Sequence, residues 1–111
     1  MVKSLVSETL DRTFTALSDP TRRSLLAAVA DGPRTVGVLA APLPMSLAAV
    51  SKHISVLERA GLVTRTRSGR NQVCELNPAP LRTAAAWLST YHRFWTTKLD
   101  ALERYLITED E

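Results

Sequence analysis

Apolar residues at the start of the chain recur every three or four positions, which is the spacing of one face of a helix. This run predicts a helix over residues 7–17, and its apolar members are Val6, Leu10, Phe14 and Leu17. A second helix is expected directly afterwards, because Asp19 can cap its N-terminus and Pro20 suits its first position. Gly32 and Pro33 then end it. The chain therefore opens with two helices in close succession.

Two further helices are predicted on either side of a proline-containing turn. Thr35 can cap a short helix that carries Val36 and Leu39. Residues 41–45 contain two prolines and must form a turn. Ser46 is a good cap for the helix that follows.

That fourth helix has one apolar and one basic face. At 100° per residue its apolar residues fall within an arc of about 80°, and they are Leu47, Val50, Ile54 and Leu57. The opposite face is small and basic and carries Ala48, Lys52, Ser55 and Arg59. Such a face suits a helix that enters a DNA groove about 12 Å wide, where bulky side chains would obstruct the approach. Gly61 ends the helix by accepting a left-handed backbone.

The next segment predicts a β-hairpin. Residues 62–67 and 72–76 form its strands, and residues 68–71 have the composition of a tight turn. Arg65 and Arg67 are two positions apart and therefore share a face. Basic residues also protect exposed sheet edges, but these arginines adjoin a basic helix, which favours a role in binding.

The last third of the chain predicts one long helix, from residue 81 to 106. Its apolar stripe alternates spacings of four and three, through Leu81, Ala85, Leu88, His92, Trp95, Leu99, Leu102 and Leu106. The helix would be about 39 Å long, more than the roughly 30 Å of a small domain, so one chain cannot cover it. We expect it to pack, with the first helix, against a second copy. The expected interface residues are Phe14, Leu88, Tyr91, Trp95, Leu99, Leu102 and Leu106.

Charge is concentrated in the helix and hairpin. The 111 residues carry a formal net charge of +3. Residues 46–71 hold five basic side chains and one acidic side chain, or +4, which leaves 9 minus 10, or −1, for the rest. A local basic surface can follow phosphates, although a solvated basic face is the commoner outcome for charge runs in general.

Hydropathy and cysteine content indicate the cellular location that we expect for the protein. The longest apolar run, Leu25–Ala30, is far shorter than the roughly 18 residues that span a bilayer, and no signal-peptide apolar region is present. We therefore expect a cytoplasmic protein with no membrane partner. Cys74 is the only cysteine, so no intrachain disulfide can form. It alternates with Leu76 on a strand, which favours a small buried residue over a redox sensor.

The predicted order of elements is that of a winged helix-turn-helix. Four segments make the likeness specific, namely ALSDPTRRSLL, LPMSLAAVSKHISVLERAGLV, SGRNQVCELNP and AAAWLSTYHRFWTTKLDALERYL. Together they resemble the ArsR family of bacterial transcriptional regulators over roughly residues 7–106. The resemblance implies a mainly α fold with a small β-hairpin, in the order α-α-α-α-β-β-α. It also implies a homodimer that binds two-fold operator sites in double-stranded DNA, usually as a repressor released by a signal.

We expect one domain over residues 1–111. Residues 7–17 would be the first dimer helix, residues 19–76 the helix-turn-helix core and wing, and residues 78–106 the C-terminal dimerisation helix.

The resemblance also implies which residues face DNA. The front of the DNA-reading helix would be Ser46, Leu47, Ala48, Ser51, Lys52 and His53, and the wing would be Arg67, Ser68, Arg70 and Asn71. Leu47 departs from the family pattern, where a polar residue is common, so at most it touches a thymine methyl group. His53 lies beside the outer face, and two roles stay open: a DNA contact, or a packed, hydrogen-bonded residue that steadies the helix.

Metal sensing is not expected. Many ArsR-type proteins bind metals through thiol pairs in the third helix or through Asp, His and Glu clusters in the last helix. Here the third helix has no cysteine or histidine, and the last offers His92 with only Asp100 and Glu103 further along. Transition metals require several convergent ligands. No cofactor is therefore expected, and any effector is unknown.

A sequence-specific DNA-binding regulator is the leading interpretation. An enzyme is not expected, because His53 and His92 are the only histidines and no paired carboxylates or glycine-rich phosphate loop accompany them. Two alternatives remain: a metal- or thiol-responsive repressor of the same family, and a winged helix that contacts proteins without binding DNA. The salt dependence of duplex binding distinguishes the second of these.

Overall fold

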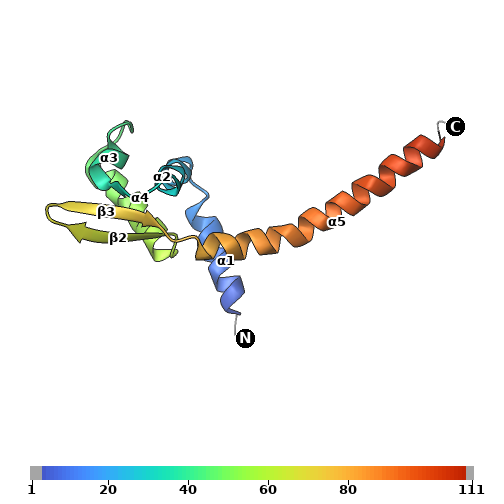
Figure 1. The fold of residues 1–111 in the computed structure, drawn as a ribbon, viewed down its shortest axis with the longest axis horizontal. Coiled ribbons are helices and arrows are strands. Elements are labelled where there is room, and N and C mark those ends of the chain that lie inside the picture. The colour runs from blue at the N-terminus through green and yellow to red at the C-terminus, as the bar shows by residue number, and fades with distance from the viewer. Residues whose placement is uncertain (1–3, 110–111) are drawn as a thin grey trace.

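The computed structural model describes residues 4–109, and within them it contains five α-helices and one three-stranded antiparallel sheet (Figure 1). In chain order the elements are α1 (Leu5–Ala16), α2 (Pro20–Ala30), β1 (Arg34–Thr35), α3 (Val36–Ala40), α4 (Leu47–Arg59), β2 (Val63–Ser68), β3 (Asn71–Leu76) and α5 (Ala79–Glu109). The domain expected over residues 1–111 includes residues 1–3 and 110–111, which lie outside the described residues.

The helix starts follow from their capping residues. The side chains of Asp19, Thr35 and Ser46 each accept a hydrogen bond from a backbone N–H three residues further on, which confirms all three predicted caps. The first helix begins earlier than predicted, because the Ser4 side chain caps it by accepting from the backbone N–H of Ser7 at 3.1 Å. A serine three residues ahead of the predicted start was the signal for this cap.

The sheet has the order β1-β3-β2. Strands β2 and β3 form the predicted hairpin, with Ser68 opposite Asn71 at its end. The two-residue turn between them begins with Gly69 at φ +62°, a conformation that glycine adopts without strain. The short strand β1 was not predicted, because two residues carry no alternation that a sequence pattern could detect. It pairs Arg34 with Cys74 of β3.

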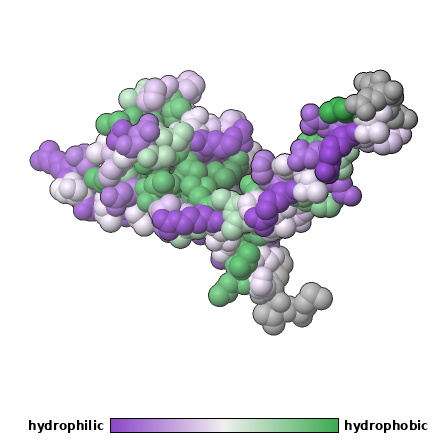
Figure 2. Space-filling view, turned by 45° about the vertical axis from the view of Figure 1, so that its right-hand side comes forward, coloured by the Kyte–Doolittle hydropathy of each residue, from purple (hydrophilic) through white to green (hydrophobic). Residues whose placement is uncertain are grey.

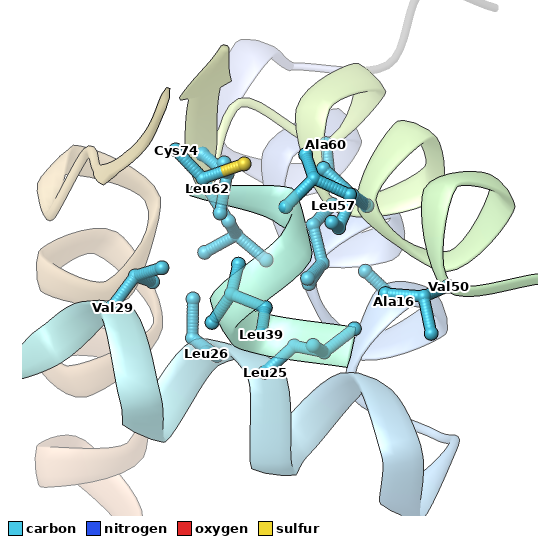
Figure 3. Packing of buried hydrophobic residues seen from close by; sticks show 13 residues of the cluster. Ala16, Leu25, Leu26, Val29, Leu39, Val50, Leu57, Ala60, Leu62 and Cys74 are labelled. Atoms are coloured by element: carbon cyan, nitrogen blue, oxygen red, sulfur yellow. The ribbon is translucent and has the colours of Figure 1, made fainter. Parts of the chain in front are cut away.

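The core gathers under α4, where residues from α1 to α4, β2 and β3 meet (Figure 3). Val50, Ile54 and Leu57 of α4 are at most 1% exposed, as their helical spacing predicted. The prediction that Leu47 shares this buried face is wrong. The residue is 58% exposed, although its helical position lies near the same apolar arc. It occupies the first turn of α4, which extends beyond the core.

The end of α4 sets the start of the hairpin. Gly61 has φ +77°, as predicted for a residue that ends a helix. The backbone N–H of Leu62 donates to the carbonyl of Leu57 at 2.9 Å, and that of Gly61 donates to the carbonyl of Glu58 at the same distance. These two bonds form a Schellman motif, which fixes the direction in which the chain leaves the helix.

Cys74 lies in the core, as its alternation with Leu76 predicted. Its side chain is fully buried and is among the residues of the cluster drawn in Figure 3. Burial raises the pKa of the thiol by disfavouring the thiolate, although the charge of Arg65 acts in the opposite direction. The thiolate is the reactive form of cysteine, so this environment lowers the reactivity of Cys74.

Helix α5 leaves the body and extends to the opposite end of the molecule from the hairpin tip (Figure 1). Its 31 residues span about 46 Å. The radius of gyration is 19.3 Å, whereas a compact chain of this length would have one of about 13 Å. Only the start of α5 packs on the body, and there Ala84 is buried while Ala85, which the predicted stripe included, is exposed. No helix in the described part of the chain is long and apolar enough to cross a membrane.

Candidate nucleic-acid interface

A surface hollow of about 540 Å³ lies between the start of α4 and the tip of the hairpin. We call it the wing hollow, and it is lined by Thr35, Val36, Gly37, Leu47, Ala48, Ser51, Arg70, Asn71 and Gln72. Five of the ten residues predicted to face DNA therefore meet in one concave surface, namely Leu47, Ala48, Ser51, Arg70 and Asn71.

The remaining predicted residues lie around this hollow or turn away from it. Ser46 is exposed at the N-cap of α4, and Lys52 is exposed on the same helix. Arg67 is exposed on β2, and its Nε donates to the carbonyl of Gly69 at 3.2 Å. Ser68 is exposed where the hairpin turns. Ser46 and Lys52 are chain neighbours of lining residues on α4, whereas Arg67 and Ser68 pair with the lining residues Gln72 and Asn71 across the hairpin.

Sequence patterns missed four lining residues. Thr35, Val36 and Gly37 belong to the start of α3, which meets α4 only in the folded chain. Gln72 lies directly opposite Arg67 in the hairpin register. Its place two residues after Arg70 was the one sequence signal that could have identified it.

His53 turns toward the start of α2. Its Nδ1 lies 3.2 Å from a terminal nitrogen of Arg22, and Arg22 also donates through Nε to the carbonyl of Ala16 at 2.6 Å. Because arginine can only donate, Nδ1 accepts this bond and the histidine proton resides on Nε2. The contact supports the packed, hydrogen-bonded role of His53 and links α4 to the end of α1.

Asp19 completes this junction. Its carboxylate lies 3.9 Å from Nδ1 of His53. The pKa of Asp19 is lowered, chiefly because the backbone N–H of Arg22 donates to it and further because the positive charge of the Arg22 side chain favours the carboxylate, while desolvation opposes the shift. The carboxylate therefore stabilises the start of α2 above the unfolded pKa of aspartate, and this contribution is lost as the pH falls through the lowered folded value.

Arg65 and Arg67 share a face of β2, as predicted, but their surroundings differ. The Arg65 side chain is only 12% exposed and forms an ion pair with Glu58 at 3.1 Å. The positive charge of Arg65 is therefore largely compensated by the carboxylate of Glu58. The exposed basic side chains of the helix and hairpin are Lys52, Arg59, Arg67 and Arg70.

We predict that Ser46 affects stability and DNA binding separately. Ser46→Ala should lower the free energy of unfolding by about 1 kcal/mol, because the backbone N–H of Ala49 loses its acceptor. Ser46→Asp should retain the cap but place a carboxylate where α4 approaches DNA. Denaturant unfolding is expected to find the Asp variant as stable as the parent, and a duplex titration to find it a weak binder. Parental affinity in the Asp variant would show that this end of α4 faces away from DNA.

The face predicted for dimerisation is exposed along α5. Its residues on that helix are between 48% and 60% exposed, and they are Leu88, Tyr91, Trp95, Leu99, Leu102 and Leu106. Phe14 of α1 joins them through an edge contact with Trp87, at 5.7 Å between ring centroids. Figure 2 shows hydrophobic residues gathered in the middle of the body, beside the root of α5, and hydrophilic residues at the wing end.

His92 lies in the exposed part of α5. Among residues 4–109, no three His, Cys, Asp or Glu side chains are grouped so that they could hold a metal ion.

Comparison with known proteins agrees with this geometry. A helix-turn-helix domain family matches residues 17–66. The HTH-type transcriptional regulator Rv2034 of Mycobacterium tuberculosis is 40% identical over 101 residues, which cover 91% of this chain and 92% of the relative. The transcriptional repressor SdpR of Bacillus subtilis is 29% identical over 82 residues, which cover 74% of this chain and 91% of the relative.

A solved structure extends the likeness to the whole fold. The crystal structure of the ArsR family transcriptional regulator RHA00566 superposes with a TM-score of 0.76 and 36% sequence identity, over 86% of this chain and 97% of that chain. The helices and the hairpin beside α4 thus define a winged helix-turn-helix protein of the transcription-regulator class. Within that class, the chain belongs to the ArsR family.

Proposed function

We propose that this chain is a homodimeric repressor that recognises a two-fold operator in double-stranded DNA. The observation that carries this proposal is the wing hollow, which joins the small outer face of α4 to the basic hairpin tip. A recognition helix in the major groove and a wing along the adjacent backbone would fill such a surface with DNA.

The residues around the hollow support a division of labour. Lys52, Arg67 and Arg70 are exposed and cationic, which suits contacts with phosphates. Smaller side chains on α4 suit the edges of the bases, and we assign this role to Ser46, Ala48 and Ser51. We assign an apolar contact, such as one with a thymine methyl group, to Leu47, and its exposure supports this role.

Dimerisation is supported by the exposed face of α5. The row consists of half-exposed aromatic and aliphatic side chains over four to five helical turns, and soluble monomers rarely leave such a continuous apolar row in water. A second copy presents the same row, so a two-fold axis can pair the two helices. The pairing would hold two wing hollows in a fixed relation.

Repression is the regulatory outcome we propose, since a relative across most of this chain is named a transcriptional repressor. A dimer on an operator blocks access of other proteins to the same DNA. Such a regulator would act in the cytoplasm, where its DNA lies, and it would be released by an effector of unknown chemistry. We assign it no catalytic role and no cofactor.

Duplex titration over a range of salt concentrations tests this function. We expect binding to a duplex selected from a random pool to weaken steeply with salt, by about 0.9 logarithmic units per unit of log salt for each phosphate contact. Binding that is absent or insensitive to salt would contradict the proposal and favour a winged helix that contacts proteins.

We further predict that zinc, nickel, cadmium or arsenite will not release the operator. The chain offers His92 without the clustered ligands that coupling between metal and DNA requires. A titration of the protein–DNA complex with each ion should leave the fraction bound unchanged. Release by a metal, abolished in His92→Ala, would instead support the metal-responsive alternative.

A further inference from the structure

We propose that Arg65 is a positioning residue for DNA reading, which fixes the wing to the recognition helix and orients the Ser51 hydroxyl without touching DNA itself. The inference rests on the proposed function and adds to it a residue that determines specificity from behind the binding surface.

The guanidinium of Arg65 joins β2, β3 and α4. One terminal nitrogen donates to Oγ of Ser51 at 2.9 Å and to Oε1 of Gln72 at 3.3 Å. The other donates to Oγ of Ser55 at 2.8 Å and to Oε1 of Glu58 at 3.1 Å. Ser51, Ser55 and Glu58 lie on successive turns of α4, so one planar side chain holds two turns of the recognition helix against both strands of the wing.

These bonds determine which hydroxyl remains available to DNA. Ser55 accepts from Arg65 and donates its own proton to the carbonyl of Ser51 at 3.1 Å. Ser51 also accepts from Arg65, but no hydrogen bond within residues 4–109 uses its proton. Because a hydroxyl has one proton, Ser51 can present a donor to the wing hollow that it lines. A donor at this place matches an acceptor on a base edge, such as N7 of a purine or O4 of thymine.

Burial and charge separate Arg65 from the phosphate-facing arginines. Arg65 is 12% exposed and is paired with Glu58, whereas Arg67 and Arg70 are exposed. The terminal nitrogens of the Arg65 guanidinium already donate to oxygens of Ser51, Ser55, Glu58 and Gln72. They therefore have few hydrogen-bond donors left for a phosphate. Replacing Arg65 should therefore remove no phosphate contact, and the dependence of DNA affinity on salt concentration should keep its slope.

The position of the Arg65–Ser51 contact along α4 explains how it fixes the orientation of the wing. The helix and β2 are connected by only three residues, Ala60, Gly61 and Leu62, so the junction alone defines one end of the wing. Arg65 adds a second attachment 14 residues back, at Ser51. Two separated attachments fix an angle, and this angle sets where Arg70 and Asn71 lie relative to the bases that α4 reads.

The test compares Arg65→Met with the matched control Arg67→Met on a duplex selected by the parent protein and on a scrambled duplex. We expect Arg65→Met to lower the affinity ratio between the two duplexes about tenfold, with an unchanged salt slope. Arg67→Met should lower the slope by about 0.9 and preserve the ratio. Thermal melting shows whether each variant is folded before its binding is compared.

A second pair of variants tests the geometry itself. Arg65→Lys keeps the charge but lacks the planar guanidinium, so it should also lower the affinity ratio between the selected and the scrambled duplex. This variant replaces Arg65→Met in the test if the methionine variant does not fold. Ser51→Ala should relax discrimination at one base pair, and Arg65→Met/Ser51→Ala should relax that same base pair no further. A parental ratio in Arg65→Lys, or a reduced salt slope with a parental ratio in Arg65→Met, would overturn the inference. Failure of the parent to bind any duplex would instead overturn the proposed function, and the inference with it.

Discussion

Leu99→Glu is expected to leave the protein monomeric and to abolish tight binding to a two-fold operator. Leu99 is 59% exposed on α5 and belongs to the row of residues that we assign to the dimer. An unpaired carboxylate in an apolar interface is costly to desolvate, and the two-fold axis introduces two of them. A combined cost of about 4 kcal/mol would weaken dimerisation about a thousandfold.

Each Leu99→Glu monomer would retain its α4 and its wing. Specific recognition, however, needs two recognition helices about 34 Å apart, one helical turn of DNA, and a monomer supplies the contacts of one half-site. Weak, salt-sensitive binding without sequence preference should therefore remain. Sedimentation of the variant, paired with titration of a two-fold duplex, measures both effects.

Thr97→Glu is the matched control for Leu99→Glu. Thr97 is exposed and lies about 160° around the helix from Leu99, so the same charge enters the opposite face. The control should sediment as a dimer and bind the operator like the parent. If the Leu99 variant were a monomer that bound the operator with parental affinity, dimerisation through α5 could not be the source of specificity.

The second large effect is expected from the combined substitution of Lys52, Arg67 and Arg70 by alanine. All three side chains are exposed. Arg70 lines the wing hollow, Lys52 follows the lining residue Ser51 on α4, and Arg67 pairs with the lining residue Gln72 in the hairpin. Loss of three phosphate contacts should reduce the salt slope by about 2.7 units. Hydrogen bonds to charged groups contribute about 1.5 kcal/mol or more each, so the affinity should fall about a thousandfold. Thermal stability should change little, because none of the three is buried.

A control of equal charge separates local contacts from general attraction. Arg82, Arg93 and Arg104 are exposed along α5, away from the hollow, and their replacement by alanine changes the net charge by the same three units. That variant should keep nearly all of the parental affinity and slope. Equal losses in the two triple variants would mean that DNA responds to total charge rather than to this surface.

The helical scaffold was predictable because local chemistry determined it. Asp19, Thr35 and Ser46 are capping residues by type, and each caps a helix in the folded chain. Gly61 follows the last residue of the apolar stripe of α4, and glycine is the residue that most readily adopts the left-handed backbone that ends a helix. In each case the signal lies within a few residues of the feature it controls, so a sequence pattern contains it.

The binding surface was less predictable because its partners come from distant parts of the chain. Arg65 and Arg67 have the same place in the strand alternation, yet only Arg65 reaches the serines of α4. His53 is held by Arg22, 31 positions away. Leu47 continues the apolar arc of α4 but lies beyond the core that buries the others. Tertiary packing decides all three, and periodicity along the chain does not record it.

Selection of bound fragments from random duplex DNA tests the central claim most directly. A homodimer with one wing hollow in each protomer should enrich a motif repeated with two-fold symmetry, whose half-sites are centred about 10 base pairs apart. The Leu99→Glu variant, carried through the same selection, should enrich no such repeat. A single unrepeated motif, or no enrichment by the parent protein, would contradict recognition of a two-fold operator by this chain.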